Sequence, residues 1–157
     1  WDICAAAVLA EDGAICGLGA RDTLRTEMGY PLHGHELSLE ISPVQASATW
    51  AIGWKKGPFH GSDVLVAQKS EGPTRRMRGL KSNDRGIPRA GMELQDGSGK
   101  IIGTVTSGTF SPTLRVGIAL ALVDTHLSIG DQVSIDIRGR ASSATIVEFP
   151  FVTSHVR

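Results

Sequence analysis

The amino-acid sequence predicts an α+β chain that is mainly β, with a short helical region followed by six strands. Two observations support this prediction. Apolar residues in the first third of the chain recur at helical spacing, whereas the rest contains short runs rich in β-branched residues, separated by Gly-rich turns and with no long helix between them. Such a series of strands is typical of a small antiparallel β-barrel or β-sandwich.

Three helices and one isolated strand are expected before residue 74. In the first two helices, apolar side chains four positions apart share one face. Gly29 stands where a left-handed residue commonly ends a helix, and Ser62 is of a residue type that caps helix N-termini. The expected helices are residues 1–11, 20–28 and 63–69, and the loosely alternating residues 47–54 predict the strand.

Six strands are expected after residue 74, each rich in β-branched residues and bounded by turn signals. The polar stretch Ser70-Glu71-Gly72-Pro73 suits a linker, so the two predicted units are residues 1–69 and 70–157. The expected strands are residues 75–81, 91–95, 101–107, 116–123, 132–138 and 140–148.

The composition is that of an ordinary globular chain. Of the 157 residues, 41% are hydrophobic and 20% are charged, which is enough apolar material to bury a core. We expect no membrane association, because no apolar run has the length of a bilayer span and no segment resembles a signal peptide. Cys4 and Cys16 form no Cys-x-x-Cys pair. We expect two reduced, packed thiols, with one disulfide as the alternative.

The net charge of zero hides a local excess of positive charge. Residues 66–90 contain 7 Lys or Arg against 2 Asp or Glu, whereas residues 1–65 contain 4 against 8. A nucleic-acid-binding protein normally carries a larger positive excess, so we expect no nucleic-acid partner. A solvated strand face explains the basic run most simply, and a small anionic ligand or an acidic partner protein is the alternative.

Two arginines in the second expected helix form the first candidate binding site. Arg21 and Arg25 lie four positions apart, where like charges repel by about 0.2–0.5 kcal/mol. Asp22 lies three positions before Arg25, so an internal ion pair can neutralise one guanidinium. The other is then free to hold a ligand carboxylate in a bidentate fork, with surface ion pairing alone as the alternative. The preceding Gly-x-Gly is not a dinucleotide motif, because Asp22 occupies the position of its third glycine.

Two further segments contain reactive residue types. His33-Gly34-His35-Glu36 has the side chains of a metal site, but the sequence contains no Cys or His cluster elsewhere that could supply further ligands. We therefore expect hydrogen-bonded loop histidines and no metal. Residues 103–113 are dense in hydroxyl groups. We expect the part from Ser107 onward to be a tight loop held by its own hydrogen bonds, with no serine nucleophile.

Several segments, taken in order, resemble the T-proteins of the glycine cleavage system. The most specific are the helix motif GLGARDTLR, which begins at Gly17, and the Thr/Ser-rich segment from Gly103 to Leu114. The resemblance runs from residue 1 to about residue 152. Its other segments are Glu27, Gly29, Pro31-Leu32, Gly34-His35-Glu36, Trp50, Gly53-Trp54-Lys55-Lys56, Arg85-Gly86-Ile87-Pro88-Arg89-Ala90-Gly91 and Pro150-Phe151-Val152.

The resemblance implies a protein that binds tetrahydrofolate in a central hole among three domains. Such a protein takes an aminomethyl group from the lipoyl arm of the H-protein, releases ammonia and forms methylenetetrahydrofolate. Residues 1–69 then correspond to the end of the folate-binding α+β domain, and residues 70–157 to the C-terminal β-barrel domain. The family's catalytic Asp lies in the preceding part, so we expect no catalytic residue in this chain and no turnover by the chain alone.

Three residues are implied as folate contacts. The family's folate-contacting Arg falls on Arg21, and the Trp after the SPVQASAT segment corresponds to Trp50, whose flat face suits an aromatic ring of the ligand. A basic or aromatic side chain near the C-terminus also reaches the folate in this family. We assign this contact to Arg157, with His155 as the alternative.

Three positions depart from the family pattern. His33 replaces a Tyr, Gln45 replaces a Glu, and Met77 stands where some members have a third Arg. These changes remove a phenol, a negative charge and a positive charge, and each bears on folate affinity more than on the fold.

Two other functions stay open on the sequence. One is the folate-binding end of a sarcosine- or dimethylglycine-oxidising flavoenzyme, which shares the architecture and captures formaldehyde equivalents on folate. The other is a non-catalytic module whose basic stretch, residues 69–89, docks an acidic partner. A flavin domain upstream would identify the first, and a tetrahydrofolate titration separates the second. We expect a bacterial cytoplasmic protein, or a mitochondrial one if the source is eukaryotic.

Overall fold

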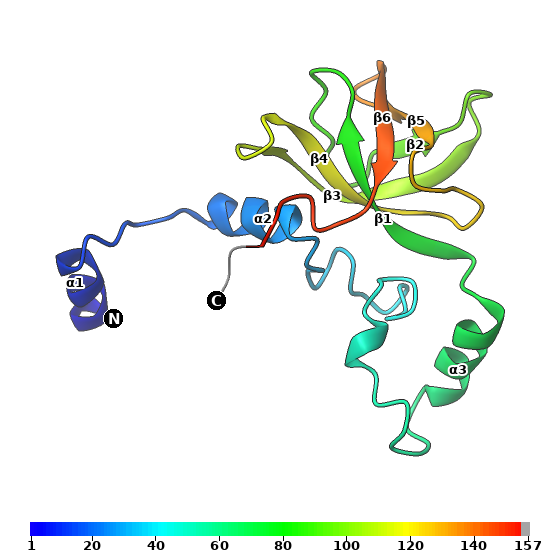
Figure 1. The fold of residues 1–157 in the computed structure, drawn as a ribbon, viewed down its shortest axis with the longest axis horizontal. Helices are drawn as coiled ribbons and strands as arrows, with labels where there is room; N and C mark the ends of the chain where they lie inside the picture. The colour runs from blue at the N-terminus through cyan, green and yellow to red at the C-terminus, as the bar shows by residue number, and fades with distance from the viewer. Residues whose placement is uncertain (155–157) are drawn as a thin grey trace.

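The computed structural model describes residues 1–154 and shows a β-barrel attached to an extended helical region (Figure 1). Three α-helices precede the barrel: α1 (Asp2–Ala10), α2 (Leu18–Glu27) and α3 (Ser62–Glu71). A short 3-10 helix, η1 (Thr49–Ala51), lies between the last two. No helix within the described residues has the length and apolar character that crossing a membrane requires.

Six strands close into a barrel in the order β1-β4-β3-β2-β5-β6, and every neighbouring pair is antiparallel. The mainly β fold and the six predicted strands are confirmed, and the closed sheet identifies the barrel rather than the sandwich. The strands are β1 (Arg75–Ser82), β2 (Glu93–Gln95), β3 (Ile101–Ser111), β4 (Val116–Asp124), β5 (Gln132–Asp136) and β6 (Ala141–Val147).

The barrel interior is filled by aliphatic side chains. All six strands contribute to one buried cluster, whose largest members include Leu80, Leu94, Ile102, Ile135 and Ile146. Burying a side chain of this size stabilises a fold by about 1.5–3 kcal/mol relative to exposing it. The hydrophobic core of the chain is therefore the inside of the barrel.

A β-bulge at Thr106 changes the direction of the side chains along β3. Before the bulge, Val105 pairs with Ala121, and both belong to the core cluster. After it, Ser107 pairs with Leu120, and neither belongs to that cluster. An extra residue in one strand shifts the following residues to the opposite face of the sheet. The side chains of Ser107, Thr109 and Ser111 consequently leave the core and contact α2.

The strand predicted for residues 47–54 is wrong. Ser47 has a φ of 57°, and the chain then turns through η1. The backbone hydrogen bonds here are local, such as the one from the N–H of Ile52 to the carbonyl of Thr49, so this segment satisfies its own polar groups without a neighbouring strand.

Two other local predictions need correction. The hydroxyl-rich segment beyond Ser107 is not a loop, because β3 continues to Ser111 in pairing with β4. Ser62 does not cap α3; it is the first helical residue, and the cap is Gly61 with a φ of 80°. The Ser62 hydroxyl accepts a hydrogen bond from the backbone N–H of Phe59 instead.

The face of α2 that packs on the barrel is polar. Its buried residues are Arg25, Thr26 and Glu27, whereas Leu24, in the expected apolar stripe, is 62% exposed. The apolar stripe therefore faces away from the barrel, and polar groups make the contact with β3.

The first helix lies apart from the barrel (Figure 1). None of the residues of α1 is buried in the part of the chain that the structure describes, and Trp1 is 99% exposed. Cys4 and Cys16 are free thiols, but both are exposed. The prediction of packed thiols is wrong, because α1 and the segment after it have no element of the barrel against them.

The chain after β6 returns to the end of α2. The backbone N–H of Phe151 donates to the carbonyl of Glu27 at 2.8 Å. Gly29 has a φ of 69°, which confirms the predicted left-handed residue after the helix, and a Cβ there would lie 2.4 Å from the ring of Phe149. The end of α2 is thus held between β3 and the C-terminal segment.

Candidate functional site

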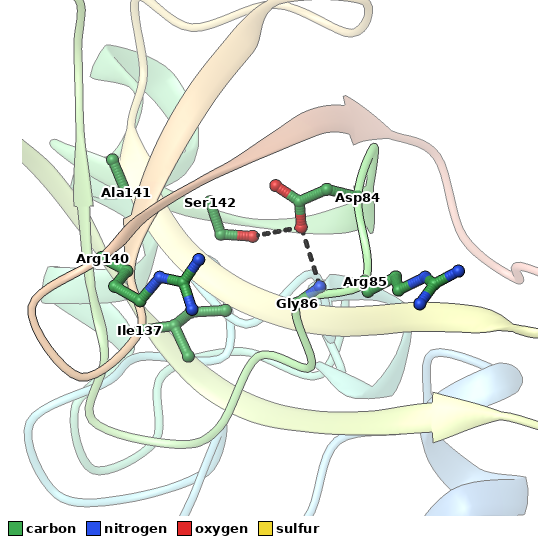
Figure 2. Close-up of a pocket in the computed structure, with 7 residues that line it drawn as sticks. All are labelled: Asp84, Arg85, Gly86, Ile137, Arg140, Ala141 and Ser142. Carbon is green, nitrogen blue, oxygen red and sulfur yellow. Dashed lines mark hydrogen bonds between the residues drawn. The ribbon is translucent and has the colours of Figure 1, made fainter.

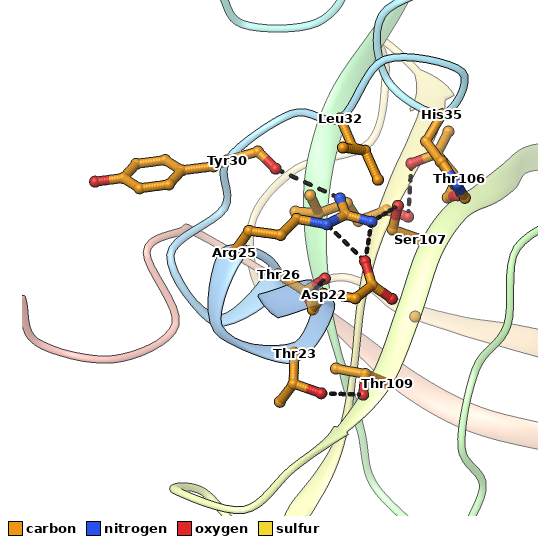
Figure 3. A network of polar contacts seen from close by, with 12 residues as sticks. Asp22, Thr23, Arg25, Thr26, Tyr30, Leu32, His35, Thr106, Ser107 and Thr109 are labelled. Carbon is orange, nitrogen blue, oxygen red and sulfur yellow. Dashed lines mark hydrogen bonds and ion pairs between the residues drawn. The ribbon is translucent and has the colours of Figure 1, made fainter. Parts of the chain in front are cut away.

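The contact between α2 and the barrel is built around one buried guanidinium. Arg25 is 8% exposed. Its Nη2 donates to the hydroxyl of Ser107 at 2.8 Å, its Nη1 to the carboxylate of Glu36 at 3.0 Å, and its Nε to the carboxylate of Asp22 at 2.8 Å (Figure 3). The predicted internal pairing of Arg25 with Asp22 is confirmed, and a second carboxylate, which the sequence did not indicate, joins it.

Glu36 completes this network from the loop after α2. Its carboxylate is 1% exposed and accepts hydrogen bonds from the Ser107 hydroxyl at 2.6 Å and from the backbone N–H of Leu32 at 3.0 Å. A buried charge is costly unless it is paired and hydrogen-bonded. With Arg25 and two neutral donors, Glu36 meets this requirement and ties its loop both to α2 and to β3.

Glu27, the last residue of α2, is a second buried carboxylate, 3% exposed. It accepts hydrogen bonds from the hydroxyls of Ser111 and Thr113 and from the backbone N–H of Thr113. Hydrogen bonds to an ionised acceptor are stronger than those between neutral groups. The C-terminal turn of α2 is thereby fixed to the end of β3.

Between these two carboxylates, the hydroxyls of Thr23 and Thr109 lie 3.1 Å apart in a hydrogen bond (Figure 3). Three hydroxyl side chains at alternate positions of β3 therefore face α2. We call these three residues the hydroxyl row: Ser107, Thr109 and Ser111.

Arg21 lies one helical turn before Arg25 and behaves differently. It is exposed and makes no hydrogen bond or ion pair with the residues that the structure describes. It borders an open groove of about 610 Å³ whose walls include Leu18, Leu24 and Tyr30. The two arginines are thus divided as the sequence suggested: one is neutralised inside the fold, and the other is available.

The other two expected folate contacts are placed differently. Trp50 lies on η1, is 85% exposed and does not line the groove at Arg21. Arg157 and its alternative His155 lie outside the described residues. Among the described residues, the lining of the groove at Arg21 therefore does not include Trp50.

Of the two histidines after α2, His35 has a structural contact. Nδ1 of His35 lies 2.8 Å from the backbone carbonyl of Thr106, the residue that the bulge leaves outside the strand ladder. Glu36, the acid of the same motif, is engaged by Arg25. Within residues 1–154, no three His, Cys, Asp or Glu side chains gather in a group able to hold a metal ion.

Two of the three departures from the family pattern lie against each other. The backbone N–H of Met77 donates to the carbonyl of Gln45 at 2.8 Å, and the side chain of Gln45 accepts from the N–H of Ser42 at 3.0 Å. Met77 is buried. The resemblance puts a Glu at position 45 and, in some members, an Arg at position 77, so relative to those members the two changes remove one charge of each sign. The third departure, His33, is exposed.

A second hollow lies at the barrel end formed by the loop after β1 and the turn before β6 (Figure 2). Its volume is about 440 Å³, and its walls include Arg85, Arg140 and Ile137. Neither arginine lies within ion-pair distance of an acid in the described part of the chain. Two arginines and one carboxylate, that of Asp84, line this hollow, so its rim has a net positive charge.

Asp84 fixes the loop that forms one wall of this hollow. It accepts hydrogen bonds from the hydroxyl of Ser142 at 2.6 Å and from the backbone N–H of Gly86 at 2.8 Å (Figure 2). These bonds, above all the one from Ser142, hold the pKa of Asp84 below its ordinary value, because they stabilise the carboxylate.

The basic run at the start of β1 is only partly solvated, in contrast to the simplest sequence interpretation. Arg75 pairs with Asp124 on β4 at 3.4 Å. Burial and then the neighbouring charge of Arg76 lower the pKa of Arg78, while Glu148 opposes this shift. These side chains share the flank of the barrel rather than standing free in water.

Sequence reasoning missed the polar contact between α2 and β3. The sequence pattern places Glu36 only in a histidine motif, and it predicts that the hydroxyl row lies in a loop. The available signal was the spacing of the row: hydroxyls at positions 107, 109 and 111 share one face of a strand, which a loop does not require.

Two known domain families match this chain. The family model of the glycine cleavage T-protein C-terminal barrel domain matches residues 75–153. The family model of the GCVT N-terminal domain matches residues 1–56. The first match covers the whole barrel, and the second includes both α2 and the Glu36 loop.

Individual proteins with similar sequences indicate the same family. The chain is 56% identical over 157 residues to an aminomethyltransferase of Parafrankia sp. (strain EAN1pec) and 55% identical over 159 residues to one of Mycobacterium avium (strain 104), covering all of this chain and 43% of each relative. The crystal structure of glycine cleavage system aminomethyltransferase T from Bartonella henselae is 34% identical with a TM-score of 0.85, over 96% of this chain and 44% of that one.

The chain therefore spans less than half the length of the relatives it matches. Its barrel, its helical region and the order of its motifs are those of one family. This chain belongs to the glycine cleavage T-protein family.

Proposed function

We propose that these residues are the C-terminal portion of an aminomethyltransferase of the glycine cleavage system. The full-length protein, meaning this chain preceded by the N-terminal part that its relatives carry, transfers the methylene of the aminomethyl-lipoyl group of the H-protein to tetrahydrofolate and releases ammonia. The observation that carries this proposal is Arg21, an unpartnered guanidinium in the described chain, beside a largely apolar groove, in a family whose relatives are named aminomethyltransferases.

The chemistry of tetrahydrofolate suits this groove. The ligand has an aromatic body and a glutamate end with carboxylates. A guanidinium binds a carboxylate through two parallel hydrogen bonds, and the side chains of Leu24 and Tyr30 offer apolar surface beside it. Arg21 therefore takes the glutamate end in this proposal.

The remaining contacts come from elsewhere in the full-length protein. Trp50 has an exposed ring face, which suits stacking on an aromatic part of the ligand. Arg157, with His155 as the alternative, supplies a second basic contact. The catalytic acid is expected in the N-terminal part, so the chain contributes binding and orientation, with residues 1–69 and 70–157 as its two units.

The H-protein, which carries the lipoate, is the proposed partner. An acidic partner suits the positive rim formed by Arg85 and Arg140, because both guanidinium groups lack an acid within ion-pair distance in residues 1–154. Complementary charge of this kind speeds association and fixes orientation. We also propose a cytoplasmic location, because the relatives named above come from bacteria.

An assay of the full-length protein tests this function. Aminomethylated H-protein is incubated with the enzyme, with and without tetrahydrofolate, and ammonia and methylenetetrahydrofolate are measured. We expect equal amounts of both products when folate is present, and no turnover by residues 1–157 alone. A bound flavin together with oxidation of sarcosine or dimethylglycine would instead establish the flavoenzyme alternative.

A further inference from the structure

We infer that Ser107, with the rest of the hydroxyl row, is a positioning device for the folate site. It fixes α2 against the barrel and thereby sets the direction of Arg21. This inference rests on the proposed role of Arg21 as a folate contact. Ser107 itself points at α2 and not into the groove, so it acts through Arg21 and not on the ligand.

The bulge at Thr106 creates this arrangement. Val105 and Ser107 are two residues apart and would share one face of an unbroken strand. Val105 lies in the core, so without the bulge the Ser107 hydroxyl would enter an aliphatic interior that offers it no acceptor. With the bulge, Ser107 meets Arg25 and Glu36 instead.

The Ser107 hydroxyl has a role that few side chains can fill. It accepts a hydrogen bond from Arg25 and donates one to Glu36, so it connects a cation and an anion in a buried place. The geometry of these bonds is directional, unlike apolar contact. They therefore fix the rotation of α2 as well as its distance from the barrel.

This rotation matters for the groove. Arg21 lies four residues before Arg25, about 6 Å along the helix axis on a neighbouring part of the surface. Thr23 and Glu27 add two more directional anchors, to Thr109 and to Ser111. Because α2 contacts the barrel through polar groups, loosening them lets the helix turn and moves the guanidinium away from a ligand carboxylate.

A double-mutant cycle in the full-length protein tests the inference. The dissociation constant of tetrahydrofolate is measured by calorimetry for the unaltered protein, Ser107→Ala, Arg21→Ala and the double variant. We expect Ser107→Ala to weaken binding about tenfold when Arg21 is present and less than about twofold when it is absent, since residues that act through one contact are not additive.

Two further variants complete the experiment. Thr145→Val is the matched control, because the hydroxyl of this β6 residue donates to the side-chain oxygen of Asn83 beside β1, and we expect unchanged folate affinity. Thr109→Val removes the weaker anchor to Thr23 and serves if Ser107→Ala does not fold. We expect it to weaken binding about two- to fivefold, again only with Arg21 in place.

The outcomes separate the two proposals. The positioning role would be overturned if Ser107→Ala and Thr109→Val weaken folate binding equally with and without Arg21. It would also be overturned if neither variant weakens binding. If Arg21→Ala itself leaves affinity unchanged, the folate assignment fails instead. A loss that depends on Arg21 supports both.

Discussion

Ser107 of β3 donates a hydrogen bond of 2.6 Å to the carboxylate of Glu36, 71 positions earlier in the chain. The same hydroxyl accepts a bond from Arg25. This small buried network links α2 and the loop after it to the barrel. Arg25, Glu36 and Ser107 are almost fully buried, and the first two are charged, so each of these three is expected to affect stability strongly.

Replacing Glu36 with Ala leaves the buried guanidinium of Arg25 with Asp22 as its remaining acid and removes an acceptor from Ser107. Breaking a buried ion pair at one partner costs about 3–5 kcal/mol. We expect a loss of this size in the free energy of unfolding, measured by urea denaturation with circular dichroism. Glu40→Ala is the control, because this exposed acid lies in the same loop and should change stability by less than about 0.5 kcal/mol. Similar losses for both variants would show that Glu36 is not a buried anchor.

A hydrogen bond from a serine hydroxyl to a carboxylate occurs in this chain both in a buried place and at the surface. Ser111 donates to the buried carboxylate of Glu27, and Ser98 donates to the exposed carboxylate of Asp96. We expect Ser111→Ala to cost about 1.5–3 kcal/mol of unfolding free energy, because it leaves a buried charge short of a donor. Ser98→Ala should cost less than about 0.5 kcal/mol. Equal costs in chemical denaturation would contradict the burial argument.

Gly108 lies where the backbone of another segment passes closely. A Cβ at this position would lie 2.3 Å from the carbonyl oxygen of Pro88, whereas one at Gly97 would meet nothing within 4 Å. We expect Gly108→Ala to destabilise the barrel by about 1–3 kcal/mol through overpacking and to lower its melting temperature. Gly97→Ala should leave the melting temperature nearly unchanged. Calorimetry that finds the same melting temperature for both variants would rule out the close approach.

Asp84 gives a prediction about pH. Its folded pKa lies below its unfolded value, so it contributes stability that is fully present above the unfolded pKa of about 3.9 and is lost as the pH falls through the folded value. Ser142→Ala removes the largest cause, and we expect the pKa of Asp84 to rise toward the ordinary value in an NMR titration. Asp96, whose pKa is lowered by its own bond with Ser98, is the internal control. If the pKa of Asp84 does not change in Ser142→Ala, groups other than Ser142 lower it.

The barrel was predictable because its signals are local. Alternating burial in β5, where Val133 and Ile135 point inward, can be read from five consecutive residues. The length of β3 was not predictable from the sequence. Its last residues are held in the sheet by β4, and their hydroxyls form hydrogen bonds with α2. Hydroxyl-rich sequence alone favours a loop, and only the partners decide otherwise.

The candidate site was predicted in part for a similar reason. The pairing of Arg25 with Asp22 lies within one helical turn, so spacing revealed it. The bonds of Arg25 to Ser107 and Glu36 join segments that are 82 and 11 positions away, and no local pattern specifies them. In addition, α2 packs on the barrel through its polar face, so the rule that the apolar stripe of a helix marks its buried side predicts the wrong face here.

The most direct measurement is the affinity of the full-length protein for tetrahydrofolate with changes at Arg21. We expect Arg21→Ala to weaken binding roughly 10- to 150-fold, the equivalent of about 1.5–3 kcal/mol for one charge-assisted contact. Arg21→Lys should recover only part of this loss, because an ammonium cannot form the fork, and Lys100→Ala, an exposed cation on the barrel, should have no effect. Undiminished affinity in Arg21→Ala would contradict the account.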